Sequence, residues 1–341
     1  MDFPRQELKR WFIETKRSFP WRENPAPYPV WVSEVMLQQT QAKVVVPYFE
    51  RWMKRFPTLQ DLAKAPIEEV IKLWEGLGYY SRARNLHEGA KYIVGVLGGK
   101  FPETEEKLLQ IKGIGSYTAG ALLNFAFRKK APAIDGNVYR VLTRYYGIEE
   151  PIDELATQRK IRELTIHLLP EEEPWIVSEA LIECGATLCQ KNPLCEKCPL
   201  MKGCVGFREG IAKVLPKKKK SVKTTPLFRI VAVIEWEGEF LIKKGERGKV
   251  MGELYEFPFV QTSELEEGIL HLEKLLDAPL TYHSKLAQVE HSFTRFRATL
   301  FPHRFSLQKR NIPGYLWVKD LNAYPFSSGH RRIAQQLVKT A

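Results

Sequence analysis

The spacing of apolar residues divides the chain into a helical part and a part that contains strands. Up to about residue 208, apolar residues recur every three or four positions, the period that places them on one face of an α-helix. Prolines fall between these stretches, where helices are expected to end. We therefore predict an all-α array of helices with short connections. The predicted helices are residues 7–18, 31–56, 67–74, 83–97, 117–127, 138–146, 158–169 and 174–184.

After Pro226 the pattern changes to short runs of β-branched and aromatic residues. Glu237-Gly238 separates two of these runs and predicts a hairpin turn. The second part is therefore predicted to be an α+β domain. Its predicted strands are residues 228–236, 239–244, 288–305 and 315–318, and its predicted helices are 263–276 and 329–338.

A linker is predicted between the two parts, at residues 209–226, because this stretch is polar and contains four consecutive lysines, Lys217–Lys220. The lysines are either solvated filler or a contact to a phosphate backbone.

At 341 residues the chain is long enough for two domains. Its net charge of +12 favours a polyanionic partner such as nucleic acid. The N-terminal residues lack a signal-peptide pattern, so we expect a cytoplasmic protein without membrane contact.

Four of the five cysteines lie close together and predict a metal-type site. Cys189, Cys195, Cys198 and Cys204 share one polar loop, and four thiolates suit either tetrahedral zinc or a four-iron cluster. The spacing alone leaves both open. The fifth, Cys184, falls within a helical apolar pattern and is predicted to lie in the core.

Residues 109–120 read as a helix, a glycine hairpin and the start of a second helix. Gly113 and Gly115 allow the turn to adopt positive φ angles without a Cβ penalty. The N-terminus of the following helix would present N–H groups to a DNA phosphate, although the segment could also be a turn of the core. Asp135, beside a tight turn downstream, is either a helix N-cap or an anion placed for chemistry on a sugar.

Longer motifs resemble the MutY adenine glycosylases, within the helix-hairpin-helix, endonuclease III-like DNA glycosylase superfamily. The C-terminal part resembles the MutY C-terminal domain, which is related to the Nudix hydrolases. The resemblance implies a helical catalytic domain at 1–208, with the hairpin at 109–120 and the cysteine loop at 189–204. It also implies a lesion-recognition domain at 227–341 after the basic linker. The motifs are Phe19-Pro20-Trp21-Arg22, residues 31–40, residues 74–85, the hairpin and Ile134-Asp135-Gly136-Asn137-Val138.

The resemblance implies that the four cysteines hold one [4Fe–4S] cluster with a structural role. This chain departs from the family in one respect. The family usually has six residues between the first two cysteines, whereas five separate Cys189 from Cys195. Cys184 is a remote substitute for the first ligand.

The resemblance also implies the chemistry. Release of adenine needs an acid that protonates the base and an anion that faces the cationic sugar. Glu34 would donate a proton to N7 of adenine, and Asp135 would stabilise the sugar cation or trap it as a transient adduct. Asn137 matches a residue that hydrogen-bonds near this carboxylate. Tyr117 stands where lyase members have a Schiff-base lysine, so we expect a monofunctional glycosylase that leaves an abasic site.

Other matched positions predict contacts to the flipped base and to the lesion. Arg22 and Glu179 would read the adenine, and Gln39 and Tyr79 would wedge into the duplex. Phe293-Thr294-Arg295 aligns with a Phe-Ser-His turn that reads 8-oxoguanine. Arg295 replaces the histidine with a permanent cation, which leaves the selectivity for the oxidised base open.

The resemblance thus predicts an adenine glycosylase that acts on 8-oxoguanine·adenine mispairs in double-stranded DNA. We expect a nucleoid-associated bacterial protein that acts as a monomer. Three alternatives compete with this prediction. A glycosylase-lyase is opposed by the absence of lysine at Tyr117. A non-catalytic DNA-binding protein with structural zinc is opposed by the pair Glu34 and Asp135. A Nudix nucleotide hydrolase is opposed by the missing catalytic signature after Leu254.

Overall fold

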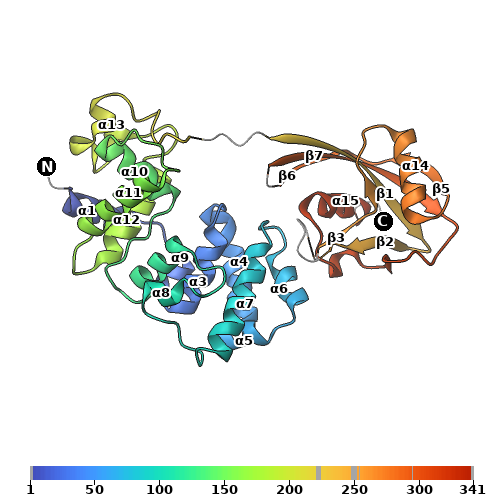
Figure 1. Cartoon of the computed structure of the whole chain (residues 1–341), viewed down its shortest axis with the longest axis horizontal. Coiled ribbons are helices and arrows are strands. Elements are labelled where there is room, and N and C mark those ends of the chain that lie inside the picture. The colour runs from blue at the N-terminus through green and yellow to red at the C-terminus, as the bar shows by residue number, and fades with distance from the viewer. Residues whose placement is uncertain (1–2, 220–223, 247–251, 253, 294, 339–341) are drawn as a thin grey trace. The chain divides into compact units, whose positions relative to one another are not determined.

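The computed structural model describes residues 3–219, 224–246, 252, 254–293 and 295–338 (Figure 1). Its contacts divide the chain into two units. The helical unit is Met1–Ala65 with Ser81–Ser221, and the sheet unit is Pro66–Tyr80 with Val222–Ala341. The short segment 66–80 thus lies between the two stretches of the helical unit in the sequence, but it packs with the C-terminal part. The domain boundaries drawn from the sequence remain a prediction.

The described part of the helical unit is all-α, as the apolar spacing predicts. Among the described residues, no helix combines the length and the apolar character that crossing a membrane requires. The elements are α1 (Arg5–Thr15), α2 (Pro20–Glu23), α3 (Pro27–Leu37), α4 (Ala42–Arg55), α5 (Leu59–Lys64), α7 (Ser81–Gly95), α8 (Glu105–Leu108), α9 (Ser116–Ala121), the π-turn η1 (Leu122–Ala126), α10 (Gly136–Tyr146), α11 (Leu155–Leu168), α12 (Pro174–Thr187), the 3₁₀ turns η2 (Cys195–Lys197) and η3 (Met201–Gly203), and α13 (Val205–Arg208).

One helix prediction is wrong, and the error concerns the functional site. The sequence predicts a single helix over 31–56, but the structure has two, α3 and α4, separated at residues 38–41. Gln39 adopts a φ of 59° there, which a continuous helix does not allow. Arg82 donates hydrogen bonds to the carbonyls of Met36 and Gln38 at the end of α3, so the broken end has a partner.

The glycine hairpin lies between α8 and α9. Gly113 has a φ of +86°, and an added Cβ would lie 2.7 Å from Cβ of Asn85, so this position needs glycine for two reasons. Gly115 precedes α9 with a φ of −96° and is extended. The expected positive φ therefore occurs at Gly113 and not at Gly115.

Helices α10 and α12 pack closely at Gly185. A Cβ added there would lie 2.6 Å from Cβ of Asn137. The core around them is formed mainly by α1, α10, α11 and α12 and includes Phe12, Leu142 and Cys184. This close packing fixes the start of α10, from which two predicted site residues project.

The described lysines before the sheet unit lie along the helical unit. Lys217 pairs with Glu149 at 2.7 Å, and Lys219 pairs with Glu154 at 3.2 Å. The carbonyl of Lys217 also accepts a hydrogen bond from the backbone of Ile152. These lysines are thus paired with local acids in the free protein.

The sheet unit is built on a mixed sheet in which β1 and β7 run parallel at the centre (Figure 1). The sheet order is β3-β2-β1-β7-β5, while β4 pairs with β1, β6 with β7 and β8 with β2. The elements are α6 (Ile67–Trp74), β1 (Thr225–Trp236), β2 (Glu239–Lys244), β3 (Tyr255–Glu256), β4 (Phe259–Val260), α14 (Leu265–Leu276), β5 (Leu280–Lys285), β6 (Val289–Phe293), β7 (Phe296–Leu307), β8 (Leu316–Val318), η4 (Leu321–Ala323) and α15 (Ser328–Val338).

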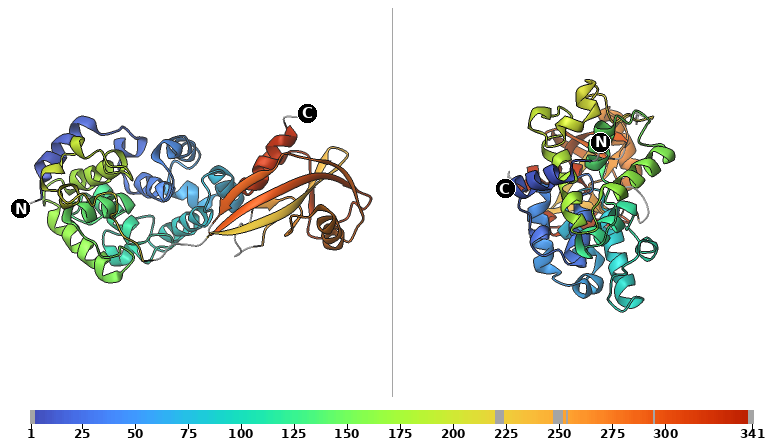
Figure 2. Two further views of the ribbon diagram at one scale, coloured as in Figure 1. Left: turned by 90° about the horizontal axis from the view of Figure 1, so that it is seen from above. Right: turned by 90° about the vertical axis from the view of Figure 1, so that its left-hand side faces the viewer.

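Helices α14 and α15 cover opposite faces of this sheet (Figure 2). Alternation along β1 sends Val231 and Val233 into the core that contains Ile333 of α15. It sends Ile230 into the core that contains Leu272 of α14. Both faces of the strand are therefore buried, which explains its near-continuous apolar sequence.

Most predicted elements of the sheet unit are present, and the α+β prediction is confirmed. Glu237 and Gly238 have φ values of 49° and 76° and form the predicted turn between β1 and β2. The predicted strand over 288–305 is instead the hairpin of β6 and β7. Strands β3, β4 and β5 were not predicted, because the first two are very short and β5 is mostly exposed.

Candidate active site

The two carboxylates predicted to carry the chemistry line one cavity of the helical unit. Glu34 comes from α3 and Asp135 from the turn before α10, and the cavity between the helices has a volume of about 1070 Å³. Arg22, Tyr117 and Glu179 also line it. The fold thus brings together residues that are about one hundred positions apart in the sequence.

Glu34 is buried, with 6% of its surface exposed. Burial raises the pKa of its carboxyl to about 7. The hydrogen bond from Tyr117 opposes this rise in pKa, whereas the negative charges of Asp135 and Glu179 add to it. The carboxyl therefore retains a proton near neutral pH, as a general acid must.

Asp135 caps the N-terminus of α10 with its carboxylate. Oδ1 accepts hydrogen bonds from the backbone N–H groups of Asn137 at 2.9 Å and Val138 at 2.8 Å. Burial raises the pKa of this carboxyl, while these N–H donors favour its ionised form. The N-cap interpretation of the sequence is confirmed, and the same bonds hold the side chain in the wall of the cavity.

Two further predicted residues hold the carboxylates in place. The Tyr117 hydroxyl donates a hydrogen bond to Oε2 of Glu34 at 2.5 Å, and burial raises the pKa of the phenol well above its ordinary value. Tyr117 is thus a neutral donor. Asn137 donates from Nδ2 to Oδ2 of Asp135 at 2.7 Å. Each of the two carboxylates thus has its own orienting partner.

An arginine-rich cluster forms another part of the cavity wall. Nε of Arg22 lies 3.3 Å from Oε2 of Glu179, and burial raises the pKa of this glutamate. Nη2 of Arg22 lies 3.0 Å from Oε2 of Glu183, which also binds Arg17 at 2.5 Å. Burial opposes ionisation of Glu183, but the hydrogen bond from Arg17 and the charge of Arg22 outweigh it and lower its pKa.

Sequence reasoning missed Glu183. The signal was present in its position one helical turn after Glu179 on α12, where both side chains share a face. Its side chain is only 1% exposed and is held by two arginines. Glu183 therefore anchors Arg22, which in turn lines the cavity.

The other predicted contacts lie in different parts of the fold. Gln39 lines the same cavity as the carboxylates. Tyr79 belongs to the sheet unit and is 48% exposed, with a φ of 47°. Phe293 ends β6, and Thr294 lies outside the described residues. Arg295 is exposed, with its guanidinium 5.2 Å from the ring centre of Phe296.

The four clustered cysteines surround one small cavity of about 30 Å³, lined also by Arg144. In the described part of the chain, no group of three or more His, Cys, Asp or Glu side chains is placed to hold a metal ion. Four cysteine sulfurs around one small cavity nevertheless suit the chemistry of an iron–sulfur cluster. The cluster ligands predicted there are Cys189, Cys195, Cys198 and Cys204.

Cys184 is buried in the core, as predicted, but its sulfur lies only 3.9 Å from that of Cys198. Its helix α12 leads directly into the cysteine loop, and the backbone N–H of Cys189 donates to the Cys184 carbonyl. The sulfur of Cys184 is thus close to the loop without lining its cavity.

Two arginines of α10 contact the cysteine loop, and one of them, Arg140, also contacts the partner of Asp135. Sequence reasoning missed both. Arg140 donates to the carbonyl of Cys189 at 2.6 Å and to Oδ1 of Asn137 at 2.7 Å. Arg144 donates to the carbonyl of Gln190 at 2.7 Å and contacts the sulfur of Cys189 at 3.3 Å. Their spacing of four residues on one helix was a signal for a shared face.

Comparison with known proteins identifies the family of the chain. The family described as HhH-GPD superfamily base excision DNA repair protein matches residues 32–166, and a NUDIX domain matches residues 230–336. The adenine DNA glycosylase of Buchnera aphidicola subsp. Schizaphis graminum is 33% identical over 306 residues, covering 87% of this chain and 86% of that protein. The human adenine DNA glycosylase is 44% identical over 210 residues, covering 59% of this chain and 38% of that protein.

Solved structures show the same helical fold. A thermostable thymine-DNA glycosylase superposes with a TM-score of 0.56 at 28% identity, covering 60% of this chain and 95% of that one. A trapped endonuclease III–DNA covalent intermediate superposes with a TM-score of 0.54 at 22% identity, covering 61% of this chain and 96% of that one.

Proposed function

The chain belongs to the adenine DNA glycosylases, the MutY family, and we propose that it removes adenine paired with 8-oxoguanine in double-stranded DNA. Family membership makes it an enzyme that hydrolyses N-glycosyl bonds, and it confirms the resemblance inferred from the sequence. The observation that carries the proposal is the placement of Glu34 and Asp135 in one cavity, in surroundings that favour a protonated Glu34.

In the proposed reaction, Glu34 donates its proton to N7 of an everted adenine. The C1′–N9 bond breaks, and its electron pair leaves with the protonated base. Tyr117 holds Oε2 of Glu34 by its hydroxyl, so the carboxyl is oriented before the substrate arrives. The pKa near 7 supports this role, because the group is an available acid at neutral pH.

Asp135 faces the positive charge that develops on the sugar. Its three N–H donors, from Asn137 and Val138, fix the carboxylate so that little reorganisation accompanies the reaction. The carboxylate stabilises the cation or traps it as a transient adduct, and water then adds at C1′ to leave an abasic site. Tyr117 cannot form a Schiff base, so the strand is not cleaved.

Recognition of the substrate involves both units in this proposal. Arg22 and Glu179 read the adenine edge, and Gln39 and Tyr79 occupy the space beside the everted nucleotide. The hairpin glycines, Gly113 and Gly115, grip a DNA phosphate, while Phe293 and Thr294 contact the 8-oxoguanine. The net charge of +12 supports DNA as the partner.

We also propose that the cysteine loop holds one [4Fe–4S] cluster through Cys189, Cys195, Cys198 and Cys204. When bound, the cluster would cross-link the loop through four thiolates. Arg140 and Arg144 would then hold the loop against α10. This arrangement supports a structural role, because the loop connects to Asp135 through Arg140 and Asn137.

Metal analysis tests the cluster and its first ligand. The purified protein should be brown and contain iron and acid-labile sulfide. Cys189→Ser should lower the iron content, whereas Cys184→Ser should leave it unchanged. A colourless zinc protein would contradict the cluster, and iron loss only in Cys184→Ser would show that Cys184 is the ligand.

A single-turnover assay tests the reaction on a duplex with one 8-oxoguanine·adenine pair. We expect strand breaks only after alkali, because the enzyme leaves an intact abasic strand. Asp135→Asn should abolish product while retaining duplex binding. Asp61→Asn, which alters a carboxylate in the first turn of α5, is the matched control and should keep the wild-type rate. Full activity of Asp135→Asn would refute the assignment.

A further inference from the structure

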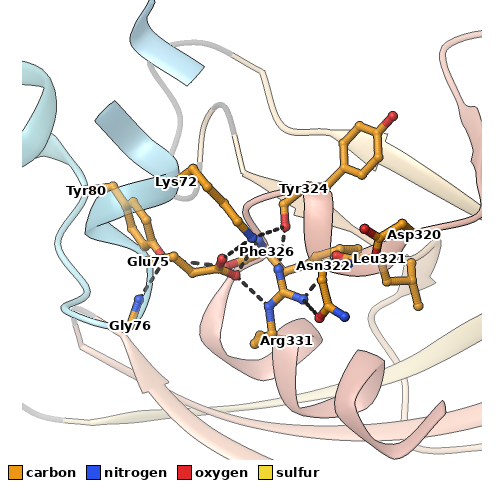
Figure 3. A network of polar contacts seen from close by, with 10 residues as sticks. All are labelled: Lys72, Glu75, Gly76, Tyr80, Asp320, Leu321, Asn322, Tyr324, Phe326 and Arg331. Carbon is orange, nitrogen blue, oxygen red and sulfur yellow. Dashed lines mark hydrogen bonds and ion pairs between the residues drawn. The ribbon is translucent and has the colours of Figure 1, made fainter. Parts of the chain in front are cut away.

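The segment 66–80 is attached to the C-terminal part of the chain by a polar network (Figure 3). It contains α6 and a loop, residues 75–80, that exposes Tyr79. The loop has positive φ values at Gly76, Gly78 and Tyr79, so its backbone is tightly turned. What fixes this loop therefore fixes the position of Tyr79.

One end of the loop is fixed by an ion pair between Glu75 and Arg331 of α15. Nε of Arg331 lies 2.6 Å from Oε1 of Glu75, and the two side chains are only 15% and 14% exposed. The same oxygen accepts a hydrogen bond from the backbone N–H of Phe326 at 3.1 Å, and Lys72 binds the other oxygen at 2.7 Å. Glu75 is thus held from three directions.

Arg331 is itself fixed in place. It donates to the carbonyls of Leu321, at 3.1 Å, and Tyr324, and its guanidinium lies 4.9 Å from the ring centre of Phe326. The other end of the loop is attached too, because the Tyr80 hydroxyl donates to the carbonyl of Phe326 at 3.4 Å. Contacts to residues 321–331 therefore flank Tyr79 on both sides.

The same helix also contacts strand β6, which leads to the predicted lesion contact Phe293. Near the start of α15, Ser328 lies 3.3 Å from Nδ1 of His291 in β6, and Arg332 donates to the carbonyl of Glu290 at 2.8 Å. A Cβ at Gly329 would lie 2.7 Å from the His291 ring, so the helix and the strand are in close contact. Strand β6 ends at Phe293, the first of the predicted lesion contacts.

We propose that Glu75 and Arg331 are positioning residues that hold the loop of Tyr79 and the end of strand β6, at Phe293, on one rigid support, helix α15. Contact of Phe293 with 8-oxoguanine is then coupled to insertion of Tyr79, and adenine excision is faster opposite the oxidised base. The inference rests on the proposed function. It concerns how specificity is produced, and such coupling requires a direct energetic test.

A double-mutant cycle on the full-length protein provides that test. The cycle compares four proteins: wild type, Glu75→Gln, Tyr79→Leu and the double variant. Single-turnover rates are measured on 8-oxoguanine·adenine and guanine·adenine duplexes. The ratio of the two rates measures lesion selectivity. Glu75→Gln should lower this ratio about fivefold or more. The double variant should be no less selective than Tyr79→Leu alone, because both changes affect one mechanism.

A second ion pair of the same segment supplies the matched control. Glu68 of α6 pairs with Lys244 of β2 at 3.3 Å, and both side chains are exposed. Glu68→Gln removes a charge from the same segment without affecting the loop, and it should keep the wild-type ratio. If Glu75→Gln does not fold, Arg331→Lys enters the same cycle, since lysine keeps the charge but loses the planar donor fork.

Binding separates this role from simple stabilisation. In an Asp135→Asn background, Glu75→Gln should weaken binding to the 8-oxoguanine duplex more than to the guanine duplex. A lower melting temperature with an unchanged selectivity ratio would overturn the proposal, as would additive effects in the cycle. Wild type without preference for the oxidised base would instead refute the proposed function.

Discussion

Two buried glutamates line the same cavity and have opposite electrostatic behaviour. At the acid end, burial raises the pKa of Glu34 to about 7. At the arginine end, Arg17 and Arg22 more than offset burial and lower the pKa of Glu183. Within one cavity, burial thus favours the neutral form of one glutamate, while arginines favour the ionised form of the other, because only Glu183 has cationic hydrogen-bond partners.

The largest expected effect comes from removing the acid. Glu34→Gln keeps the shape of the side chain but has no transferable proton, so single-turnover adenine release should slow about 10²- to 10⁴-fold. The measurement is the rate on an 8-oxoguanine·adenine duplex. Glu173→Gln, at an exposed ion pair with Lys9, is the control and should match wild type. A near-normal rate for Glu34→Gln would end its assignment as the acid.

Substitution of Glu183, which holds Arg17 and Arg22, should affect the stability of the protein as well as substrate binding. Glu183→Gln leaves Arg17 and Arg22 without their shared counter-charge, and we expect a loss of about 1–3 kcal/mol in the free energy of unfolding. Urea denaturation measures it. Glu171→Gln removes an exposed partner of Lys130 and should change stability by less than about 1 kcal/mol. Equal losses of stability in the two variants would show that the buried ion pairs of Glu183 contribute no more than an exposed ion pair.

Close packing between α10 and α12 is expected to have an effect of similar size on stability. Gly185→Ala places a Cβ 2.6 Å from Cβ of Asn137. The clash should cost about 1–3 kcal/mol and displace the amide that orients Asp135, so activity falls with stability. Gly95→Ala is the control, because a Cβ there meets nothing within 4 Å. Unchanged activity of Gly185→Ala would mean that the position of Asn137 is not critical.

The smallest effect tests the environment of the acid itself. The Tyr117 hydrogen bond lowers the pKa of Glu34, against the larger effect of burial. Tyr117→Phe should therefore raise that pKa and move the alkaline loss of activity to higher pH. Single-turnover rates across the pH range measure the shift. Movement to lower pH would show that the hydroxyl stabilises the neutral acid instead.

How much of this could be predicted from the sequence depends on whether the signal is local. Periodicity located most helices, and family motifs identified Glu34, Asp135 and Tyr117 as candidates. The break at Gln39 was missed because no glycine or proline marks it, although residues 38–41 are all polar. The attachment of Glu75 to Arg331 was also missed, since partners 256 residues apart leave no periodic trace.

The measurement that tests the central claim most directly is the pH dependence of single-turnover adenine release by wild type and Glu34→Gln. A buried acid with a pKa of about 7 predicts that the wild-type rate falls as the pH rises through that value, because the proton to be donated is lost. The residual rate of Glu34→Gln should lack this fall. A wild-type rate that stays constant through pH 7, or the same fall in Glu34→Gln, would contradict the assignment of Glu34 as the acid.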